Sequence, residues 1–188
     1  MENFTGIILA GGKSKRMGTD KGMLHLNGKP FITHIYEAMK PIFGDNIVVV
    51  SSNTDYDTFG YNRIEDLILD KGPVGGLYTA LKQSKTKFNL VLSVDVPLVS
   101  TELLQWLVDN HDDSYLVTQV QAGEKVSSLV AVYDRALRTL LGEHLAGNQL
   151  KLRDVIAEVN PQTLTVPKKW SSQLQNINTE EDYKNIQK

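Results

Sequence analysis

A stretch rich in glycine and cations, LAGGKSKRMGTDKG, spans residues 9–22 near the start of the chain. Glycines allow backbone N–H groups to approach an anion without interference from a Cβ atom. Arg16 can bind two phosphate oxygens at once, and Lys21 is a compact charge that suits a triphosphate. A solvated loop between a strand and a helix could carry the same cations without binding anything. The residue types therefore favour a phosphate ligand, with the plain loop as the alternative.

The stretch does not follow the spacing of the common phosphate-binding loops. Gly12, Lys13 and Ser14 resemble the end of a P-loop, but that motif requires a glycine at the position of Ile7. The G-x-G-x-x-G fingerprint of dinucleotide-binding folds is also absent from the sequence. A P-loop nucleotidase and a dinucleotide-dependent enzyme are therefore disfavoured.

Two acidic residues follow apolar runs at positions where a ligand could meet them. Asp95 ends the run LVLSVD shortly before a proline, where a carboxylate facing a triphosphate could hold Mg²⁺. It could instead cap the turn into a helix expected at 101–111. Asp66, in RIED, could accept the N–H donors of a guanine edge, or it could lie in an exposed acidic loop. Both carboxylates keep a functional and a structural interpretation.

Two further segments are expected to begin helices. Residues 72–76, GPVGG, would open a helix whose N-terminus favours an anion or a ligand carbonyl, or would form a plain turn. Residues 176–182, NINTEED, predict a helix start with Asn178 as N-cap and Glu181 three residues later, as in a capping box.

The histidines show no metal-ligand spacing and no Ser or Cys partner motif, so we expect structural or surface roles for all of them. They are His25, His34, His111 and His144. Hydrolase triads and histidine metal sites therefore lack support in the sequence.

Alternating strand and helix patterns must position these side chains. Short β-branched runs predict strands at 5–10, 46–52, 88–94, 115–120 and 127–133. Helical periodicity predicts helices at 30–42, 75–84 and 101–111. The first three strands are almost continuously apolar, as in parallel sheets buried on both faces, whereas the last two strands follow each other directly. We expect one α/β domain over 1–188, with a Rossmann-like three-layer fold and a mainly parallel, mixed sheet.

Composition narrows the class of ligand. The 188 residues include 20 Lys and Arg and 22 Asp and Glu, a formal net charge of −2. Nucleic-acid binding by electrostatics needs an excess of cations, so a small anion is the better ligand.

The chain has no cysteine, which excludes disulfides and thiolate metal sites. Because no segment approaches the ~20 apolar residues that cross a bilayer, and no signal peptide is evident, we expect a cytoplasmic protein without membrane partners.

The pattern L-A-G-G-x-S-x-R-M-G-x-x-K, from Leu9 to Lys21, resembles the signature of nucleotidyltransferases of the sugar-nucleotide type. The resemblance is greatest to the MobA-type molybdenum cofactor guanylyltransferases. Further resemblances occur in order, at LNGKP (26–30), IED (64–66), DKGPVGGL (70–77), LSVDVPLVS (92–100) and NINTEEDY (176–183). The resemblance thus covers almost the whole chain. It implies transfer of GMP from GTP to the phosphate of molybdopterin, with release of pyrophosphate.

The same resemblance assigns roles to individual residues. It implies catalytic roles for Arg16, Lys21 and Asp95, with Asp95 binding Mg²⁺ or Mn²⁺. The implied nucleotide-binding residues are Leu9, Ala10, Gly11, Gly12, Lys21, Ser51, Asp66 and Asp95. The implied residues on the acceptor side are Asn176, Asn178 and Lys151. The partners it implies are GTP, molybdopterin and a protein that delivers the pterin.

Two departures from the family pattern concern substrate choice. Ser51 stands where the family often has Asn, with Asn53 two residues later, and Ser127-Ser128 replaces a His-Pro pair on the acceptor side. Related activities therefore stay open: a cytidylyltransferase for the same pterin, a sugar-phosphate or phospholactate nucleotidyltransferase, or a nucleotide-binding protein without catalysis. Lys151 is either an acceptor-phosphate ligand or a cation on a helix surface.

Overall fold

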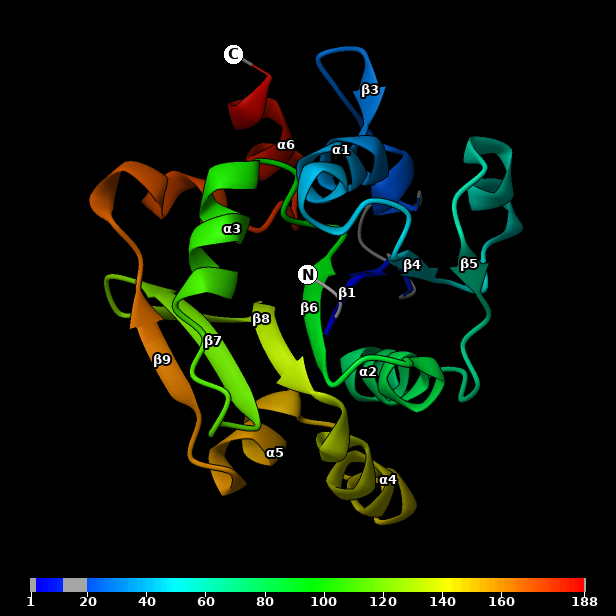
Figure 1. The fold of residues 1–188 in the computed structure, drawn as a ribbon. Helices are drawn as coiled ribbons and strands as arrows, with labels where there is room; N and C mark the ends of the chain where they lie inside the picture. Colours follow the sequence, from blue (N-terminus) through cyan, green and yellow to red (C-terminus); the bar gives the residue numbers. More distant parts are fainter. Residues whose placement is uncertain (1–2, 12–19, 188) are drawn as a thin grey trace.

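The computed structural model describes residues 3–11 and 20–187 of the chain. Within these ranges, a seven-stranded sheet runs through the middle of the molecule and helices cover both of its faces (Figure 1). Gly12 and Arg16, two of the residues implied for nucleotide binding and catalysis, lie outside the described residues.

Strands predicted in the first half of the chain are adjacent in this sheet. β1 (Phe4–Leu9) pairs in parallel with β4 (Ile47–Val50) on one side and with β6 (Phe88–Ser93) on the other. β5 (Arg63–Ile64) adds a further parallel strand beside β4. Side chains on both faces of β1 and β6 are almost all buried, which explains why their sequences are almost continuously apolar.

The second half of the chain adds the antiparallel part. β8 (Lys125–Asp134) pairs antiparallel with β6 and with β7 (Val117–Ala122), and β9 (Gln162–Thr165) pairs in parallel with β7. The order across the sheet is β5-β4-β1-β6-β8-β7-β9. The predicted antiparallel insertion and the mainly parallel, mixed sheet are both confirmed. A separate hairpin of β2 (His25–Leu26) and β3 (Lys29–Pro30) precedes the first helix.

Helices form the two outer layers. The α-helices are α1 (Phe31–Phe43), α2 (Gly72–Gln83), α3 (Thr101–Asp109), α4 (Arg138–Ala146), α5 (Leu152–Glu158) and α6 (Glu180–Ile186). The 3₁₀ helices are η1 (Lys21–Met23), η2 (Thr54–Phe59), η3 (Arg135–Leu137) and η4 (Lys168–Leu174). α1 and α3 cover one face of the sheet, while α2, α4 and α5 cover the other (Figure 1). The three-layer prediction is confirmed.

Alternation along β1 divides the core between these layers. Ile8 belongs to the cluster with Ile35 of α1 and Leu104 of α3. Its neighbour Ile7 points the other way, into the cluster with Leu77 of α2 and Leu141 of α4. Each of these side chains is at most 1% exposed. The two cores therefore fix the central strands on both faces and hold their carboxyl ends in place.

The carboxyl-terminal segment returns to the same end of the sheet as the carboxyl ends of the parallel strands. Ile177 is fully buried with Leu26 and Phe31, against which Tyr183 also packs. The Tyr183 hydroxyl donates to the carbonyl of His25 over 2.7 Å. The segment around 176–183 is therefore anchored to the β2–β3 hairpin and the start of α1.

The predicted cap of α6 is wrong by one residue. Thr179 is the N-cap: its hydroxyl accepts from the Asp182 N–H, and the Asp182 carboxylate accepts from the Thr179 N–H. Asn178 and Glu181 have equally suitable side chains for a capping box. Asn178, however, uses its side-chain oxygen to accept a bond from Lys21, so the cap falls to Thr179.

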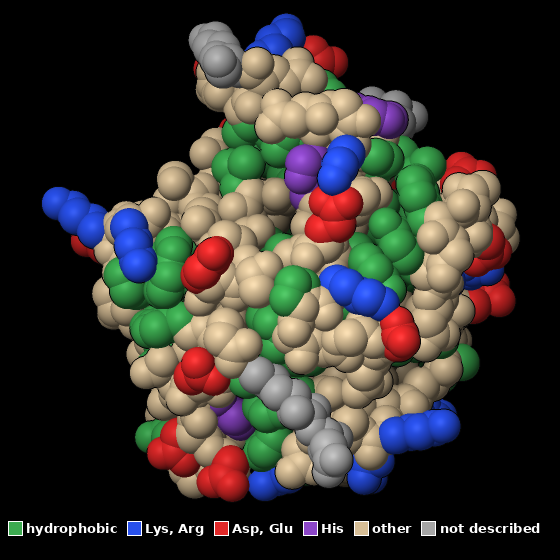
Figure 2. Space-filling view, turned by 45° about the horizontal axis from the view of Figure 1, so that its top comes forward, with side chains coloured by type: hydrophobic (Ala, Val, Ile, Leu, Met, Phe, Trp, Pro, Cys, Tyr) green, Lys and Arg blue, Asp and Glu red, His purple; other side chains and the backbone are tan. Residues whose placement is uncertain are grey.

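Surface charge is mixed on the face drawn in Figure 2. There Lys, Arg, Asp and Glu side chains are scattered over the surface, and several blue groups lie next to red ones. This distribution matches the formal net charge of −2. In the part of the chain that the structure describes, no helix has the length and apolar character needed to cross a membrane.

Candidate functional site

Asp95 lies one turn beyond the carboxyl end of β6 and is held by the carboxyl-terminal segment. Its backbone carbonyl accepts from the Ile177 N–H over 2.8 Å, and its Oδ2 accepts from Nδ2 of Asn176 over 3.1 Å. The other oxygen, Oδ1, is buried and has no hydrogen-bond partner among the described residues. An unpaired buried carboxylate oxygen is costly unless a donor or a cation meets it.

The structural alternative for Asp95 is wrong. Ser100 is the N-cap of α3, and its hydroxyl accepts from the Leu103 N–H over 3.3 Å. Asp95 is thus free of a capping role, and the open oxygen fits a hard cation, because Mg²⁺ prefers carboxylate and phosphate oxygens. Within 3–11 and 20–187, Asp95 included, no three His, Asp or Glu side chains gather as a metal cluster, so Asp95 is a single carboxylate ligand candidate.

Lys21 and Asp95 meet the same short segment of chain. Lys21 begins η1, and its Nζ donates to Oδ1 of Asn178 over 2.5 Å. Asn176, two residues earlier, donates to Asp95. We call the glycine- and cation-rich stretch at residues 9–22 the basic loop. Its first residue, Leu9, accepts through its carbonyl from the Val94 N–H over 3.1 Å, so it lies directly beside the residue that precedes Asp95. The structure therefore attaches Lys21 and Asp95 to positions two residues apart on the carboxyl-terminal segment.

Leu9 and Ala10 belong to the sheet and the core at this end of β1. Both side chains are buried in the core, at 7% and 4% exposure. The Ala10 N–H donates to the Val50 carbonyl over 3.0 Å. Gly11, by contrast, is exposed, and a Cβ atom placed there would contact nothing within 4 Å. Gly11 is thus the position at which the described chain leaves the sheet with open space around it.

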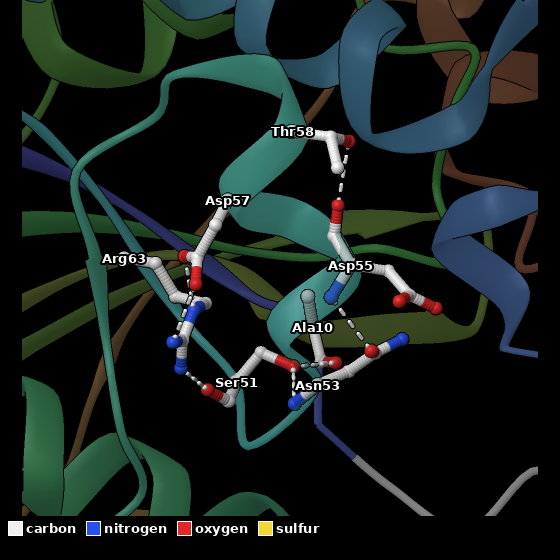
Figure 3. A network of polar contacts seen from close by, with 7 residues as sticks. All are labelled: Ala10, Ser51, Asn53, Asp55, Asp57, Thr58 and Arg63. Carbon is white, nitrogen blue, oxygen red and sulfur yellow. Dashed lines mark hydrogen bonds and ion pairs between the residues drawn. The ribbon is translucent and has the colours of Figure 1, made fainter.

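Ser51 ties the carboxyl ends of β1 and β4 together (Figure 3). Its hydroxyl donates to the Ala10 carbonyl over 3.0 Å and accepts from the Asn53 N–H over 3.1 Å. Nη1 of Arg63 donates to the Ser51 carbonyl over 2.9 Å. The side chain is 1% exposed. Because the Ser51 hydroxyl already makes these two bonds, its role is to hold the carboxyl ends of β1 and β4 together.

Arg63 is itself oriented by Asp57 (Figure 3). Its Nε and Nη2 donate to the two carboxylate oxygens of Asp57 over 2.6 and 2.9 Å. This hydrogen-bonded guanidinium holds the pKa of Asp57 below its ordinary value. Since the Asp57 side chain is half exposed, the pair contributes little stability and mainly sets the direction of Arg63.

Asp66 is oriented by α2. Its Oδ1 accepts from the Ile68 N–H over 3.1 Å and from the Thr79 hydroxyl over 2.8 Å. The predicted helix opening at GPVGG is confirmed, since α2 begins at Gly72. Thr79 is fully buried on α2. It was not predicted as a partner of Asp66, because the spacing between the two residues matches no recognised motif.

A cavity of about 360 Å³ lies at the carboxyl end of β7, on the antiparallel side of the sheet. Its lining consists of Ala122, Gly123, Lys125, Ser127, Ser171, Ser172, Leu174 and Gln175. The Ser127 hydroxyl is buried and has no hydrogen-bond partner among the described residues. The chain runs from Gln175 directly into Asn176, so the cavity borders the segment that holds Asp95.

Lys151 is exposed just before α5 and is not among the residues that line this cavity. Three residues earlier, Oδ1 of Asn148 accepts from Nζ of Lys71, at the start of α2, over 2.8 Å. That contact brings the turn before Lys151 to the side of the site where α2 begins. The structure does not bring Lys151 together with Asn176 and Asn178.

Histidines occupy structural positions, as predicted. Nε2 of His34 bonds the Leu26 carbonyl over 2.7 Å. His111 bonds the Thr118 hydroxyl, and His144 lies 2.8 Å from a Glu158 carboxylate oxygen. Burial lowers the pKa of His111. These imidazoles support loops and helices instead of entering the site.

Asp20 is a site residue that sequence reasoning passed over. It directly precedes Lys21 and accepts three hydrogen bonds, from the Gly22 N–H, the Tyr56 hydroxyl and Nδ2 of Asn53. The donors Asn53 and Tyr56 lie more than thirty residues away from it in the chain. Only the fold could bring them to the basic loop.

Comparison with known proteins shows the family of the chain. Residues 6–164 match the family model of the MobA-like NTP transferase domain. A Flavobacterium johnsoniae protein named "Probable molybdenum cofactor guanylyltransferase" is 39% identical over 99% of this chain and 97% of its own length. A protein of the same name from Aquifex aeolicus is 31% identical over 95% of this chain and 88% of its own.

Solved structures show the same fold. A crystal structure of an Aquifex aeolicus protein superposes with a TM-score of 0.82 at 30% identity, covering 94% of both chains. Molybdopterin-guanine dinucleotide biosynthesis protein A from Archaeoglobus fulgidus superposes with a TM-score of 0.83 at 22% identity, covering 97% of this chain and 96% of its own. From the family match over most of its length and from these relatives, the chain belongs to the MobA-like NTP transferases.

Proposed function

We propose that the protein is a molybdenum cofactor guanylyltransferase, which transfers GMP from GTP to the terminal phosphate of molybdopterin. The relatives' names support this activity. The observation that carries it is the meeting of Lys21 and Asp95 on one carboxyl-terminal segment, with Oδ1 of Asp95 left open. A bound nucleoside triphosphate needs positive charge around its phosphates. Lys21 would supply one cation, and Asp95 would hold a metal ion that supplies more. We further propose that the whole chain, 1–188, forms one domain that acts in the cytoplasm.

The reaction joins two polyanions, so neutralising charge is the main requirement. An oxygen of the acceptor phosphate forms a bond to the α-phosphorus of GTP. The bond from that phosphorus to the bridging oxygen breaks, and pyrophosphate leaves with the electron pair. No general base is needed, because the acceptor phosphate is already ionised at neutral pH. A Mg²⁺ or Mn²⁺ ion held by Asp95 would supply Lewis-acid charge at the α-phosphate.

Lys21 would take up the charge that develops on the leaving pyrophosphate, together with Arg16 from the same basic loop. In the structure, Lys21 donates to the amide oxygen of Asn178. A phosphate oxygen is a stronger acceptor than a neutral amide, so a bound triphosphate would draw the ammonium group away from Asn178. Asn178 thus holds Lys21 at the site before the nucleotide arrives.

Guanine would be recognised on the side of Asp66, and the pterin on the side of the cavity. Thr79 and the Ile68 N–H occupy one oxygen of Asp66, which orients the carboxylate toward donors such as guanine N1–H and N2–H. The cavity beside Gln175 offers the cation of Lys125 to a polar, anionic acceptor. A protein that hands over molybdopterin is a further proposed partner.

Pyrophosphate release with molybdopterin and each of the four NTPs tests the proposal. We expect turnover with GTP and Mg²⁺, and little with ATP, CTP or UTP. A preference for CTP or UTP would replace the guanylyl assignment by one of the related nucleotidyltransferases. GTP binding without pyrophosphate release, over several phosphate acceptors, would instead indicate a nucleotide-binding protein without catalysis.

A further inference from the structure

Asp20, directly before Lys21, accepts three hydrogen bonds from described residues. Its Oδ1 accepts from the Tyr56 hydroxyl over 2.5 Å and from the Gly22 N–H over 3.0 Å. Its Oδ2 accepts from Nδ2 of Asn53 over 2.9 Å. Two of these donors come from the segment that follows β4. The carboxylate therefore has little freedom to rotate or shift.

Tyr56 is the rigid part of this cluster. The side chain is fully buried, and burial, with a further contribution from Asp20, raises the pKa of its hydroxyl well above the ordinary value. The hydroxyl therefore stays protonated and remains a donor. Packing is equally tight, because a Cβ atom built on Gly22 would lie 2.1 Å from the Tyr56 hydroxyl oxygen and 2.7 Å from Val94.

The cluster controls the direction of Lys21. Asp20 is the N-cap of η1, and Lys21 is the first residue of that 3₁₀ helix. Fixing the Asp20 side chain and the Gly22 N–H fixes the backbone on both sides of Lys21. The backbone N–H of Asn53 also donates to the Ser51 hydroxyl after β4, so the cluster ties Lys21 to the carboxyl end of that strand.

We infer that Asp20, held by the Tyr56 hydroxyl and the Asn53 amide, is a positioning residue that aims Lys21 at the outer phosphates of the bound nucleoside triphosphate. This inference rests on the proposed nucleotidyl transfer. Asp20 would not bind the phosphates directly, because both groups are anionic and the carboxylate already accepts bonds from three protein donors. It acts by fixing the backbone from which the lysine side chain reaches the phosphates.

Binding of GTP and GMP, measured side by side with Mg²⁺, tests this role. Tyr56→Phe keeps the buried ring and removes the donor to Asp20. The loss of one hydrogen bond to a charged group corresponds to about a tenfold change in equilibrium. We expect Tyr56→Phe to weaken GTP binding by about tenfold and GMP binding by less than about twofold, because GMP lacks the outer phosphates.

Tyr133→Phe is the matched control. Tyr133 is also fully buried, and its hydroxyl donates to the Ser128 carbonyl over 2.6 Å, away from Asp20. It should lose as much thermal stability as Tyr56→Phe but leave the ratio of GTP to GMP affinity unchanged. If both tyrosine variants change that ratio equally, the effect belongs to general packing and the inference is wrong.

A double-mutant cycle with Lys21→Ala separates the inference from the proposal beneath it. In the Lys21→Ala background, Tyr56→Phe should cause no further loss of GTP affinity, since the lysine it positions is gone. If Lys21→Ala does not distinguish GTP from GMP, the placement of Lys21 and this inference both fail. If Lys21→Ala distinguishes them and Tyr56→Phe does not, this inference alone fails.

Asn53→Ser provides a second variant in case Tyr56→Phe does not fold. Serine retains an oxygen that can accept from the Asp55 N–H and cap η2, as Asn53 does, but it is too short to reach Asp20. We expect the same selective loss of GTP affinity, about threefold or more, with η2 intact. Equal affinity losses for GTP and GMP in this variant would also contradict the inference.

Discussion

Replacing Asp95 by Asn should separate catalysis from folding. The substitution preserves the shape of the side chain, so an oxygen can still accept from Nδ2 of Asn176, now 3.1 Å away. The backbone bond from the Ile177 N–H does not depend on the side chain. The substitution removes the negative charge of the carboxylate, whose buried Oδ1 has no hydrogen-bond partner among the described residues.

The expected effects on stability and rate differ greatly in size. Turning a charge-assisted hydrogen bond into a neutral one costs about 1 kcal/mol, and relief of an uncompensated buried charge offsets part of it. The melting temperature should therefore fall by no more than about 4 °C. A metal ion supplies several kcal/mol of transition-state stabilisation, and about 4 kcal/mol corresponds to a 10³-fold loss of rate.

Pyrophosphate release under saturating GTP, molybdopterin and Mg²⁺ measures the rate, and a thermal melt of the same samples measures stability. Asp134→Asn is the matched control, since Asp134 also ends a strand and accepts from the Ala136 N–H on the capped turn into η3. That variant should lose similar stability and keep its turnover. Turnover of Asp95→Asn within tenfold of the native protein would refute the metal-binding role.

Further predictions concern the basic loop, the base and the carboxyl-terminal segment. Lys21→Ala should weaken GTP binding by about tenfold or more and GMP binding far less; equal losses in a titration would place Lys21 away from the outer phosphates. Gly22→Ala should lower the free energy of unfolding by about 1–3 kcal/mol in urea denaturation, because the new Cβ atom would overlap the Tyr56 hydroxyl; an unchanged midpoint would contradict the packing. Asp66→Asn should reduce the preference for GTP over ATP in competition binding, and an unaltered preference would remove Asp66 from base recognition. The N–H bonds to Asp182 hold its pKa below the ordinary value of 3.8, so their stabilising effect is present above that value and is lost as pH falls through the lowered pKa; amide exchange at the α6 cap should rise in acid, and Asp182→Asn should abolish that dependence.

The central strands were predictable because burial of both of their faces leaves a run of apolar residues in the sequence. Residues 5–10, 46–52 and 88–94 are almost continuously apolar, as is typical of strands covered on both faces, and they form β1, β4 and β6. β9 escaped prediction. Its pairing with β7 is supported by polar cross-strand contacts, from Gln119 to Thr163 and from Gln121 to Thr165, which no hydrophobic pattern can reveal.

The site was predictable where residue type alone determines the chemistry. Lys21 and Asp95 are a cation after a glycine turn and a carboxylate after a strand, and both positions have a physical meaning in the sequence itself. The contacts that orient them depend on tertiary structure. Tyr56 and Thr79 were overlooked because each is an ordinary core side chain until the fold places its hydroxyl on Asp20 or Asp66.

The position of a bound nucleotide and its metal ion tests the central claim most directly. A crystal structure with GTP and Mg²⁺ should show the triphosphate along the loop that follows β1, with Lys21 on the outer phosphates and the ion on Oδ1 of Asp95. A triphosphate bound elsewhere, or a metal ion that leaves Asp95 untouched, would contradict the account.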